Sequence, residues 1–201
     1  MEQKNYPKIR FPDFEDDWQE YSMEELYTER KEQGNDSLPI LTVSIHSGIS
    51  DGELDEDNMG RFVRRSEDKT AYKHVCAGDL VFNMMRAWQG AIGSAKCEGM
   101  VSPAYIVAEP NEKVFPPFMD YYVKRKEFIE QVNTLSYGVT DFRKRLYWDS
   151  FIKVKCRLPS VIEQRRIAEM LGEYEQLLNK EKQSLEKMER LKNGLLQQMF
   201  V

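Results

Sequence analysis

The stretch LPSVIEQRRIAEML, residues 158–171, opens the part of the chain that decides its architecture. No proline follows Pro159 up to Val201, and apolar residues recur at steps of three and four. This spacing places them on one face of a helix, which at 1.5 Å per residue is about 60 Å long. Glu, Gln, Arg and Lys occupy the opposite face. We therefore predict one long amphipathic helix over residues 158–201.

The apolar face of this helix follows a heptad pattern that is interrupted by Glu181 and Lys192. A compact domain of ~155 residues is roughly 40 Å across, so about 20 Å of the helix would overhang it. Each uncovered Leu or Met forfeits roughly 1.5–3 kcal/mol of burial. Pairing with a partner helix is therefore favoured over folding back on the same domain after a kink at Gly172 or Gly194. The predicted pairing positions are Ile167, Leu171, Tyr174, Leu178, Leu185, Met188, Leu195 and Met199.

Composition favours a folded protein, because 41% of the 201 residues are hydrophobic and 11% are aromatic. No apolar run approaches the ~20 residues that cross a bilayer, and the N-terminal residues lack the apolar stretch of a secretory signal. Three cysteines without a C-x-x-C pair, together with only two histidines, argue against a disulfide framework and a zinc site. We expect a cytoplasmic protein without a bound metal.

Charge is distributed unevenly along the chain. Residues 1–60 hold 5 basic and 16 acidic side chains, a net charge of −11, whereas residues 61–155 hold 16 and 11, a net charge of +5. Residues 156–201 hold 8 basic and 7 acidic side chains. Attraction to phosphates depends on local lysine and arginine density, so contact with a nucleic acid is expected from the middle segment.

Before the long helix, the sequence mixes strand and helix patterns without a βαβ rhythm, which predicts an α+β domain. Residues 1–19 are expected to form an extended arm, 20–157 the globular domain and 158–201 the long helix. Ser22 and Glu25 form a capping box, which predicts a helix that ends at Gly34. Two prolines open a second predicted helix over residues 116–136. Alternating apolar residues predict strands within residues 38–49, 80–86, 91–96, 101–110 and 151–158.

The sequence contains none of the common catalytic motifs: it has no phosphate-binding glycine loop, no G-x-S-x-G and no H-E-x-x-H. Acidic residues alternate from Asp51 to Asp57, but Gly60 is misplaced for a calcium loop and the glutamate at the twelfth position is missing. A solvated loop is therefore the favoured interpretation.

Two segments carry side chains suited to DNA. In FNMMRAWQGAIG, residues 82–93, Arg86 can read guanine edges, and Asn83 and Gln89 can read adenine edges. In YGVTDFRKR, residues 137–145, a polar loop presents donors for backbone phosphates; these are Thr140, Arg143, Lys144 and Arg145. The segment GRFVRR, residues 60–65, adds three more arginines. A single basic residue is more often a solvated surface charge, whereas basic loops interleaved with amides and aromatics indicate nucleic-acid binding.

The sequence resembles one half of the specificity subunit of type I restriction-modification systems. The likeness runs from PKIRFPDFEDDW (7–18) through GDLVFNMMRAWQGAIG (78–93) and SPAY (102–105) to LKNGLLQQMF (191–200). Its most specific part is RLYWDSF (145–151) followed by LPSVIEQRRIAEML, in which a strand, a proline stop and the E-Q helix start occur together.

The resemblance implies a non-catalytic chain that recognises double-stranded DNA. Members of the family have two target-recognition domains, each followed by a long helix, and the two helices pair as an antiparallel coiled coil. The helices set the spacing of a split target and dock DNA-adenine methyltransferase (modification) subunits, which bind S-adenosylmethionine. A separate restriction and translocating subunit cuts the DNA, so no cofactor is expected in this chain.

This sequence holds one such domain and one helix. Two interpretations remain open: a half-length subunit or truncated form, and a homodimer whose two-fold pairing buries the apolar stripe. In the second case Glu181 and Lys192 would meet across a dyad near residues 186 and 187. A helix of ~60 Å beside a duplex that rises ~3.4 Å per base pair covers at most ~18 base pairs.

Two alternatives from other classes are also considered. One is a coiled-coil protein-interaction adaptor without DNA recognition. The other is a nuclease that would use Asp79, Glu98 and Lys96.

Overall fold

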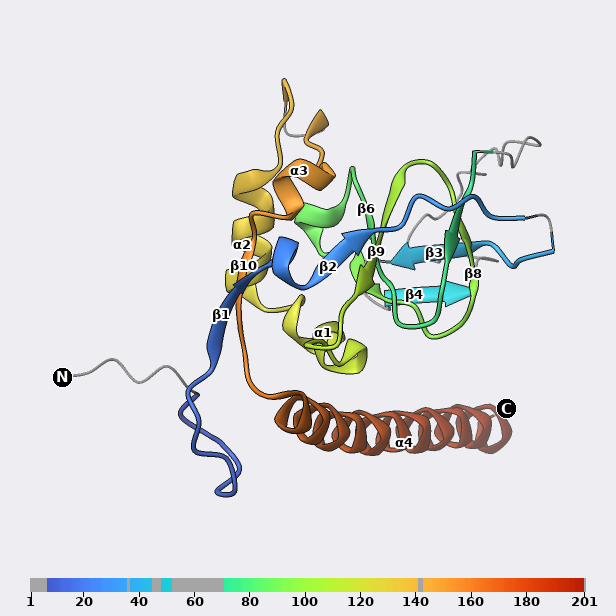
Figure 1. Cartoon of the computed structure of the whole chain (residues 1–201). Helices are drawn as coiled ribbons and strands as arrows, with labels where there is room; N and C mark the ends of the chain where they lie inside the picture. The colour runs from blue at the N-terminus through green and yellow to red at the C-terminus, as the bar shows by residue number, and fades with distance from the viewer. Residues whose placement is uncertain (1–6, 36, 45–47, 52–70, 141–142, 201) are drawn as a thin grey trace.

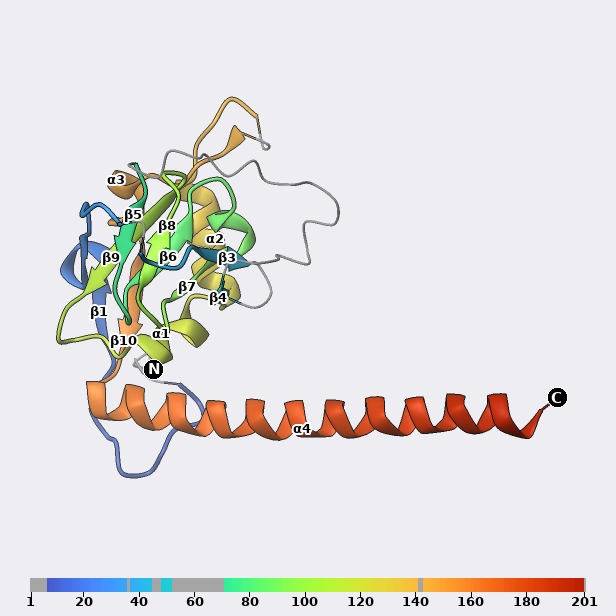
Figure 2. The same cartoon turned by 90° about the vertical axis from the view of Figure 1, so that its right-hand side faces the viewer.

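The computed structural model describes residues 7–35, 37–44, 48–51, 71–140 and 143–200. A globular part of strands and short helices precedes one long helix, α4 (Val161–Met199), which runs beneath it and extends beyond it (Figure 1, Figure 2). This confirms the predicted α+β class with a long C-terminal helix. None of the described helices combines the length and apolarity needed to cross a lipid bilayer. Ile45, the acidic residues from 53 to 57 and the arginines of residues 60–65 lie outside the described residues.

The centre of the globule is a four-stranded antiparallel sheet in the order β2-β9-β6-β7, and three two-stranded sheets surround it. The strands are β1 (Gln19–Ser22), β2 (Tyr27–Glu29), β3 (Leu41–Ser44), β4 (Gly48–Asp51), β5 (Lys73–Val75), β6 (Leu80–Asn83), β7 (Ile92–Ser94), β8 (Gly99–Val101), β9 (Tyr105–Pro110) and β10 (Lys155–Leu158). The two-stranded sheets pair β1 with β10, β3 with β4 and β5 with β8. All five predicted strand regions therefore contain strands.

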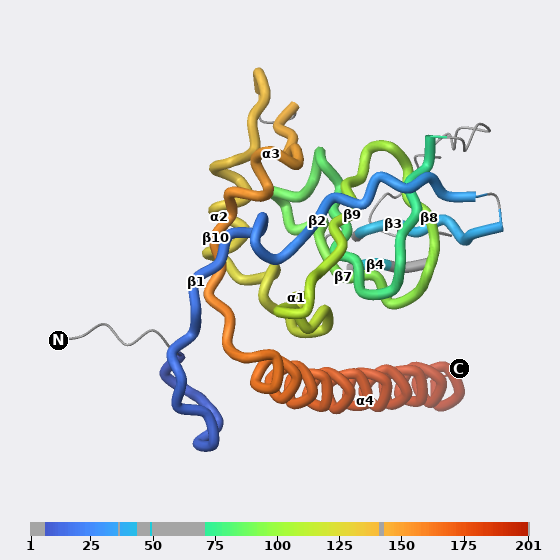
Figure 3. The backbone as a smooth tube through the Cα atoms, in the orientation of Figure 1, coloured from blue at the N-terminus to red at the C-terminus, as the bar shows by residue number. Residues whose placement is uncertain are grey.

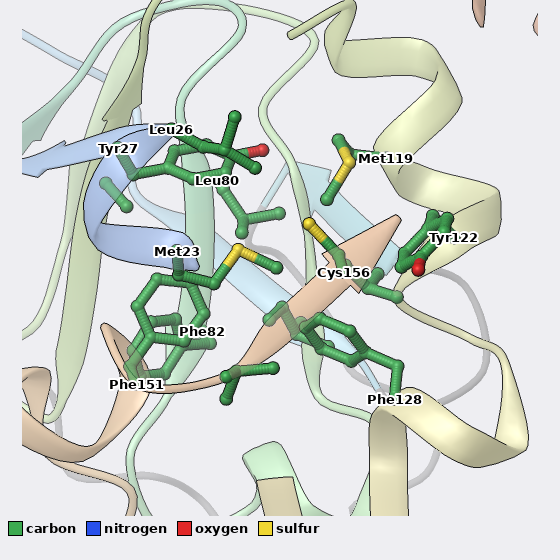
Figure 4. Packing of buried hydrophobic residues seen from close by; sticks show 14 of the residues in the cluster. Met23, Leu26, Tyr27, Leu80, Phe82, Met119, Tyr122, Phe128, Phe151 and Cys156 are labelled. Carbon is green, nitrogen blue, oxygen red and sulfur yellow. The ribbon is translucent and has the colours of Figure 1, made fainter. Parts of the chain in front are cut away.

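The central sheet is buried on both faces. Leu80 and Phe82 of β6 belong to one apolar cluster, whereas Val81 between them belongs to a second. Successive side chains of a strand point to opposite faces, so β6 separates two cores. The larger core packs the sheet against the helices, and in it the rings of Phe82 and Phe151 lie 4.7 Å apart, centroid to centroid (Figure 4). The smaller core lies between β6 and the β3 to β5 region and includes Leu41.

The predicted helix over residues 22–34 is wrong. The Ser22 amide does donate to Glu25 Oε2 at 2.7 Å, as a capping box requires, but only the 3-10 turn η1 (Met23–Glu25) follows. The chain then enters β2, which pairs with β9. Leu26 and Tyr27 are buried in the larger core, and their packing in the sheet outweighs the helix preference of the surrounding glutamates.

The predicted helix over residues 116–136 is two helices, α1 (Pro116–Tyr122) and α2 (Lys126–Leu135). The prolines stand at the start of α1, as predicted. The break at residues 123–125 lets Val123 and Phe128 both enter the larger core. A short helix, α3 (Trp148–Phe151), precedes β10 in the region where only a strand was predicted.

The two ends of the globular part lie side by side, because β1 pairs with β10 from Gln19–Leu158 to Ser22–Lys155 (Figure 3). Pro159 ends β10, and Ser160 caps α4 by accepting the Glu163 amide at 3.3 Å. The described N-terminal residues lie against the start of α4 (Figure 2). The domain boundaries at residues 19 and 157 stay a prediction.

Candidate nucleic-acid interface

The first predicted segment forms a tight loop between β6 and β7. Asn83 Oδ1 accepts the Met85 amide at 2.9 Å, and the Trp88 indole donates to the Met85 carbonyl at 3.0 Å. The 3-10 turn η3 (Ala87–Gln89) follows and ends at Gly90, whose φ of 102° is a left-handed conformation that favours glycine. Buried Ala87 anchors the turn, whereas Gln89 is exposed.

The second segment is a hairpin-like loop between α2 and α3. Tyr137 and Arg145 exchange two backbone hydrogen bonds of 3.1 and 3.0 Å across its base. The Arg143 amide donates to the Thr140 carbonyl at 2.8 Å, which closes the tip. A side chain on Gly138 would come within 2.3 Å of the Arg143 carbonyl oxygen, so this close approach requires glycine. In the described residues of this loop, 137–140 and 143–145, the paired base fixes the backbone of Arg145.

The fold joins these two loops, which lie more than 40 positions apart in the sequence. The Leu146 amide donates to the Met84 carbonyl at 2.9 Å. The Lys144 ammonium lies 5.9 Å from the Trp88 ring centroid and 3.4 Å from Asn133 Oδ1. The joined loops lie at the end of the globule remote from α4 in both views (Figure 1, Figure 2).

A hollow of about 470 Å³ opens at the junction. Its aromatic wall is Tyr137 and Tyr147, whose rings are 5.0 Å apart and inclined by 32°. Met85 also lines it, together with Gly138, Val139, Arg143 and Arg145. Desolvation, followed by the Asp149 carboxylate, raises the pKa of Tyr137 above its ordinary value of 10.0. Apolar surface, aromatic faces and two guanidinium groups thus meet in one place.

The predicted DNA-binding residues occupy different positions around this hollow. Arg143 and Arg145 line it, and Thr140 is exposed at the tip beside it. Lys144 turns toward Trp88, and Arg86 opens η3. Asn83 is half-buried and its amide oxygen already holds the turn, which gives it a structural role. The base and phosphate contacts assigned to all seven residues remain predictions.

Sequence reasoning missed the apolar part of this surface. Val139 is 89% exposed, Tyr137 54% and Met85 45%. The available signal was the pair Tyr137 and Val139 in an otherwise polar loop next to a glycine. Exposed apolar residues grouped in one place mark binding surfaces more often than single ones do.

The acidic residues of the nuclease hypothesis serve the fold. Asp79 is 2% exposed, accepts Arg30 Nε at 2.7 Å and receives the Cys76 amide at 2.7 Å. Glu98 accepts a hydrogen bond from the His74 imidazole at 2.8 Å. Within the part of the chain that the structure describes, no three metal-ligating side chains cluster. These carboxylates are therefore structural partners.

The apolar stripe of α4 divides into a covered and an open part. Ile167 packs partly against the larger core, and Leu171 is half-buried. The remaining predicted pairing positions, namely Tyr174, Leu178, Leu185, Met188, Leu195 and Met199, are between 46% and 73% exposed. The helix continues through Gly172 and Gly194, so the alternative of a kinked helix folded back on the globule is wrong. About seven turns of helix, from Tyr174 to Met199, present an uncovered stripe.

Comparisons with known proteins find relatives that are similar in sequence and in fold. No protein-family model matches the chain. A putative type I restriction enzyme MjaX specificity subunit from Methanocaldococcus jannaschii is 21% identical over 216 residues, which cover 98% of this chain and 49% of the relative. A solved chain described in work on complex assembly and conformational transition of the type I R-M system is 17% identical. It superposes with a TM-score of 0.54 over 89% of this chain and 43% of its own length.

The chain has the fold of a type I specificity subunit. The HsdS subunit from Thermoanaerobacter tengcongensis agrees, with 15% identity and a TM-score of 0.50 over 89% of this chain and 42% of that chain. The resemblance to specificity subunits is thereby confirmed. The chain spans about half the length of the curated relative it matches.

Proposed function

We propose that this chain is a DNA-binding specificity subunit of a type I restriction-modification system, and that it recognises one part of a two-part target. The specificity-subunit fold carries the proposal, and the joined loops give it a recognition surface. Residues 20–157 would form the target-recognition domain. The chain itself would be non-catalytic, with cleavage and methylation supplied by other subunits.

Within the joined loops, we assign two kinds of contact. Arg86 stands at the start of η3 and Gln89 is exposed within it, and both would read base edges. Asn83 holds the turn through its amide oxygen and would add a base contact through its amide nitrogen. Thr140, Arg143, Lys144 and Arg145 would hold phosphates, because their loop is exposed and donor-rich. The apolar hollow would accept thymine methyl groups or sugar edges.

Binding of duplex DNA by the full chain tests this assignment. Selection from a random duplex pool identifies the preferred sequence, and Arg86→Ala should then cost roughly 1–3 kcal/mol at one base pair. Arg143→Ala should instead weaken all sequences alike and lower the salt slope by about one. Lys126→Ala is the matched control, because Lys126 opens α2 at the end opposite to the loop, about 15 Å along the helix axis. Salt-independent binding without sequence preference would refute the function.

We further propose that α4 pairs with the α4 of a second copy as an antiparallel coiled coil. Its 39 residues span about 58 Å, and its second half is apolar along one side and open. Two-fold pairing would bury that stripe on both copies and would place two recognition domains on one duplex, with a palindromic split site as the consequence. At ~3.4 Å per base pair, the half-sites would lie within about 17 base pairs.

Methyltransferase subunits would dock on the paired helices, and S-adenosylmethionine would be held by them. The support is the specificity-subunit fold, together with the charged outer face of α4. Mixing the chain with a modification subunit should give adenine methylation of only the selected duplex, measured by methyl incorporation. Methylation of unrelated duplexes at the same rate would contradict the proposal.

A coiled-coil adaptor without DNA recognition is the alternative, and the open stripe of α4 favours it equally. The two functions differ in the globular part. An adaptor would be unaffected by Arg143→Ala, whereas a specificity subunit would lose DNA affinity in this variant.

A further inference from the structure

The junction between the globule and α4 contains a buried ion pair that links the N-terminal segment to the first turn of α4. Arg10 donates from Nε to Glu163 Oε1 and from Nη2 to Glu163 Oε2, both at 2.8 Å. Glu163 is 1% exposed, and the Trp18 indole also approaches its Oε1 at 3.4 Å. Arg10 Nη2 donates in addition to the Asp16 carbonyl at 2.6 Å, which holds the N-terminal segment in a bent shape. The two-pronged contact fixes both the distance and the plane of the guanidinium.

The neighbouring residue Gln164 is fully buried and binds the globule on another side of the helix. Its Nε2 donates to the carbonyls of Lys113 at 2.9 Å and Pro159 at 3.0 Å, and its Oε1 accepts the Phe115 amide at 2.9 Å. Successive helix residues point about 100° apart. Glu163 and Gln164 therefore hold the first turn of α4 from two directions.

The next two residues of α4 are cationic and extend this junction. The Arg166 guanidinium lies 5.2 Å from the Phe11 ring centroid, and Arg165 lies 4.4 Å from the Phe115 ring centroid. Phe11 belongs to the N-terminal segment and Phe115 to the globule, so α4 lies between them. A hydrogen bond of 3.1 Å from the Tyr121 hydroxyl to Glu175 is a further contact along α4.

A buried bidentate ion pair adds little to the free energy of unfolding, but it restricts the angle between the elements that it joins. Two apolar residues of similar size would often stabilise such a site as well as a buried ion pair does. A buried carboxylate without its cation, in contrast, is strongly disfavoured, and a bidentate pair tolerates only a narrow geometry. Rocking α4 away from the globule would strand Glu163, so the pair penalises changes in the direction of the helix.

We propose that the Arg10–Glu163 pair sets the direction of α4 relative to the globule, and that Arg10 is a positioning residue for the spacing of the two half-sites. This rests on the proposed function. From Glu163 to Met199 the helix measures about 54 Å at 1.5 Å per residue. A pivot of about 10° at the junction therefore moves the far end by about 9 Å, which equals nearly three base pairs of duplex at ~3.4 Å each.

Distance measurement between two spin labels tests the junction without DNA. One label is placed on exposed Cys97, and the other on Glu189→Cys in the open half of α4, with Cys76→Ser to avoid a third site. Cys156 stays, since burial raises the pKa of its thiol to about 12 and keeps it unreactive. Labelled chain is diluted into an excess of unlabelled full-length chain, so that only distances within one copy are recorded.

Arg10→Met should shift or broaden the distance distribution by several ångströms, and Arg10→Lys should do so less, because lysine cannot contact both oxygens. Lys8→Met is the matched control in the same segment, with an exposed side chain, and should leave the distribution unchanged. An unchanged distribution in Arg10→Met overturns the proposal, whatever the change in melting temperature. If Arg10→Met does not fold, Arg10→Lys decides by the same criterion.

Selection of duplexes forms the second arm. Arg10→Met should keep the half-site sequence and accept spacers that vary by about three base pairs more than the wild type does. A broadened distance distribution with an unchanged spacer refutes the role in spacing. If the wild-type chain selects no duplex, the proposed function fails while the distance measurement still decides whether Arg10 directs the helix.

Discussion

The open stripe of α4 leads to a quantitative prediction for self-association. Leu178 and Leu185 are 59% and 56% exposed in the single chain. Complete burial of a leucine is worth roughly 1.5–3 kcal/mol, so covering the exposed part of each yields about 1–1.7 kcal/mol. In a two-fold interface every substitution occurs twice. Leu178→Ala with Leu185→Ala should therefore weaken the dimer by about 4–7 kcal/mol, or roughly 10³- to 10⁵-fold in Kd.

Sedimentation velocity over a dilution series measures this Kd directly. Gln176→Ala with Gln183→Ala is the matched control, because each glutamine lies two residues, or about 200°, from a stripe position on the same helix. Both glutamines are exposed, and alanine keeps the helix preference. The control should dimerise as tightly as the wild type.

Two outcomes would refute the reasoning. A wild-type chain that stays monomeric at its highest soluble concentration would mean that the stripe does not pair with another copy. A leucine variant whose Kd equals that of the glutamine variant would mean that the interface lies elsewhere. Circular dichroism must show unchanged helix content in both variants, because α4 could otherwise fray before it fails to pair.

Three further predictions concern the globule. Hydrogen bonding to Glu98 raises the pKa of His74 in the folded protein above its ordinary value of 6.5. The pair therefore stabilises the fold fully below pH 6.5, and this stabilisation is lost as the pH rises through the pKa of His74 in the folded protein. The melting temperature of His74→Gln should be lower than that of the wild type in acid and should converge on it in alkali. Arg30→Met should lower the free energy of unfolding, measured in urea, by roughly 3–5 kcal/mol, because it leaves the buried Asp79 carboxylate without its cation. Adding Asp79→Asn should recover part of the loss. Gly99→Ala should lower the free energy of unfolding by roughly 1–3 kcal/mol, because the new methyl group would lie 2.6 Å from Leu41 Cγ in β3. An unchanged melting temperature would contradict this close packing.

The parts of the fold that were predictable are those in which local pattern and tertiary packing agree. The heptad pattern predicts α4 because it places the apolar residues on one face of a helix. The apolar residues of β3, β6 and β9 predict strands because these side chains are buried against the faces of a sheet. The segment after Ser22 fails for the opposite reason. Its glutamates favour a helix, but Leu26 and Tyr27 are worth more inside the sheet, and only the partner strand β9 reveals this.

The candidate site was predictable in its residue chemistry but not in its geometry. The donors of η3 and of the loop after α2 follow from composition, whereas their meeting depends on long-range contacts such as the Leu146–Met84 backbone hydrogen bond and the approach of Lys144 to Trp88. Such a long-range contact leaves no trace in either segment. The Arg10–Glu163 pair was missed likewise, because 153 positions separate its members and each side chain alone resembles a surface charge.

The fold separates the joined loops from the start of α4. The joined loops lie at the opposite end of the globule from α4, with the larger core between them (Figure 1). Free energies of substitutions at sites separated by more than about 10 Å without shared partners add nearly independently. Val139 and Thr140 are exposed, so replacing them leaves both the core and the Arg10–Glu163 pair intact. Under the proposed function, substitutions at the loop tips are therefore expected to change the target sequence without changing the spacing, and substitutions at Arg10 are expected to change the spacing without changing the half-site.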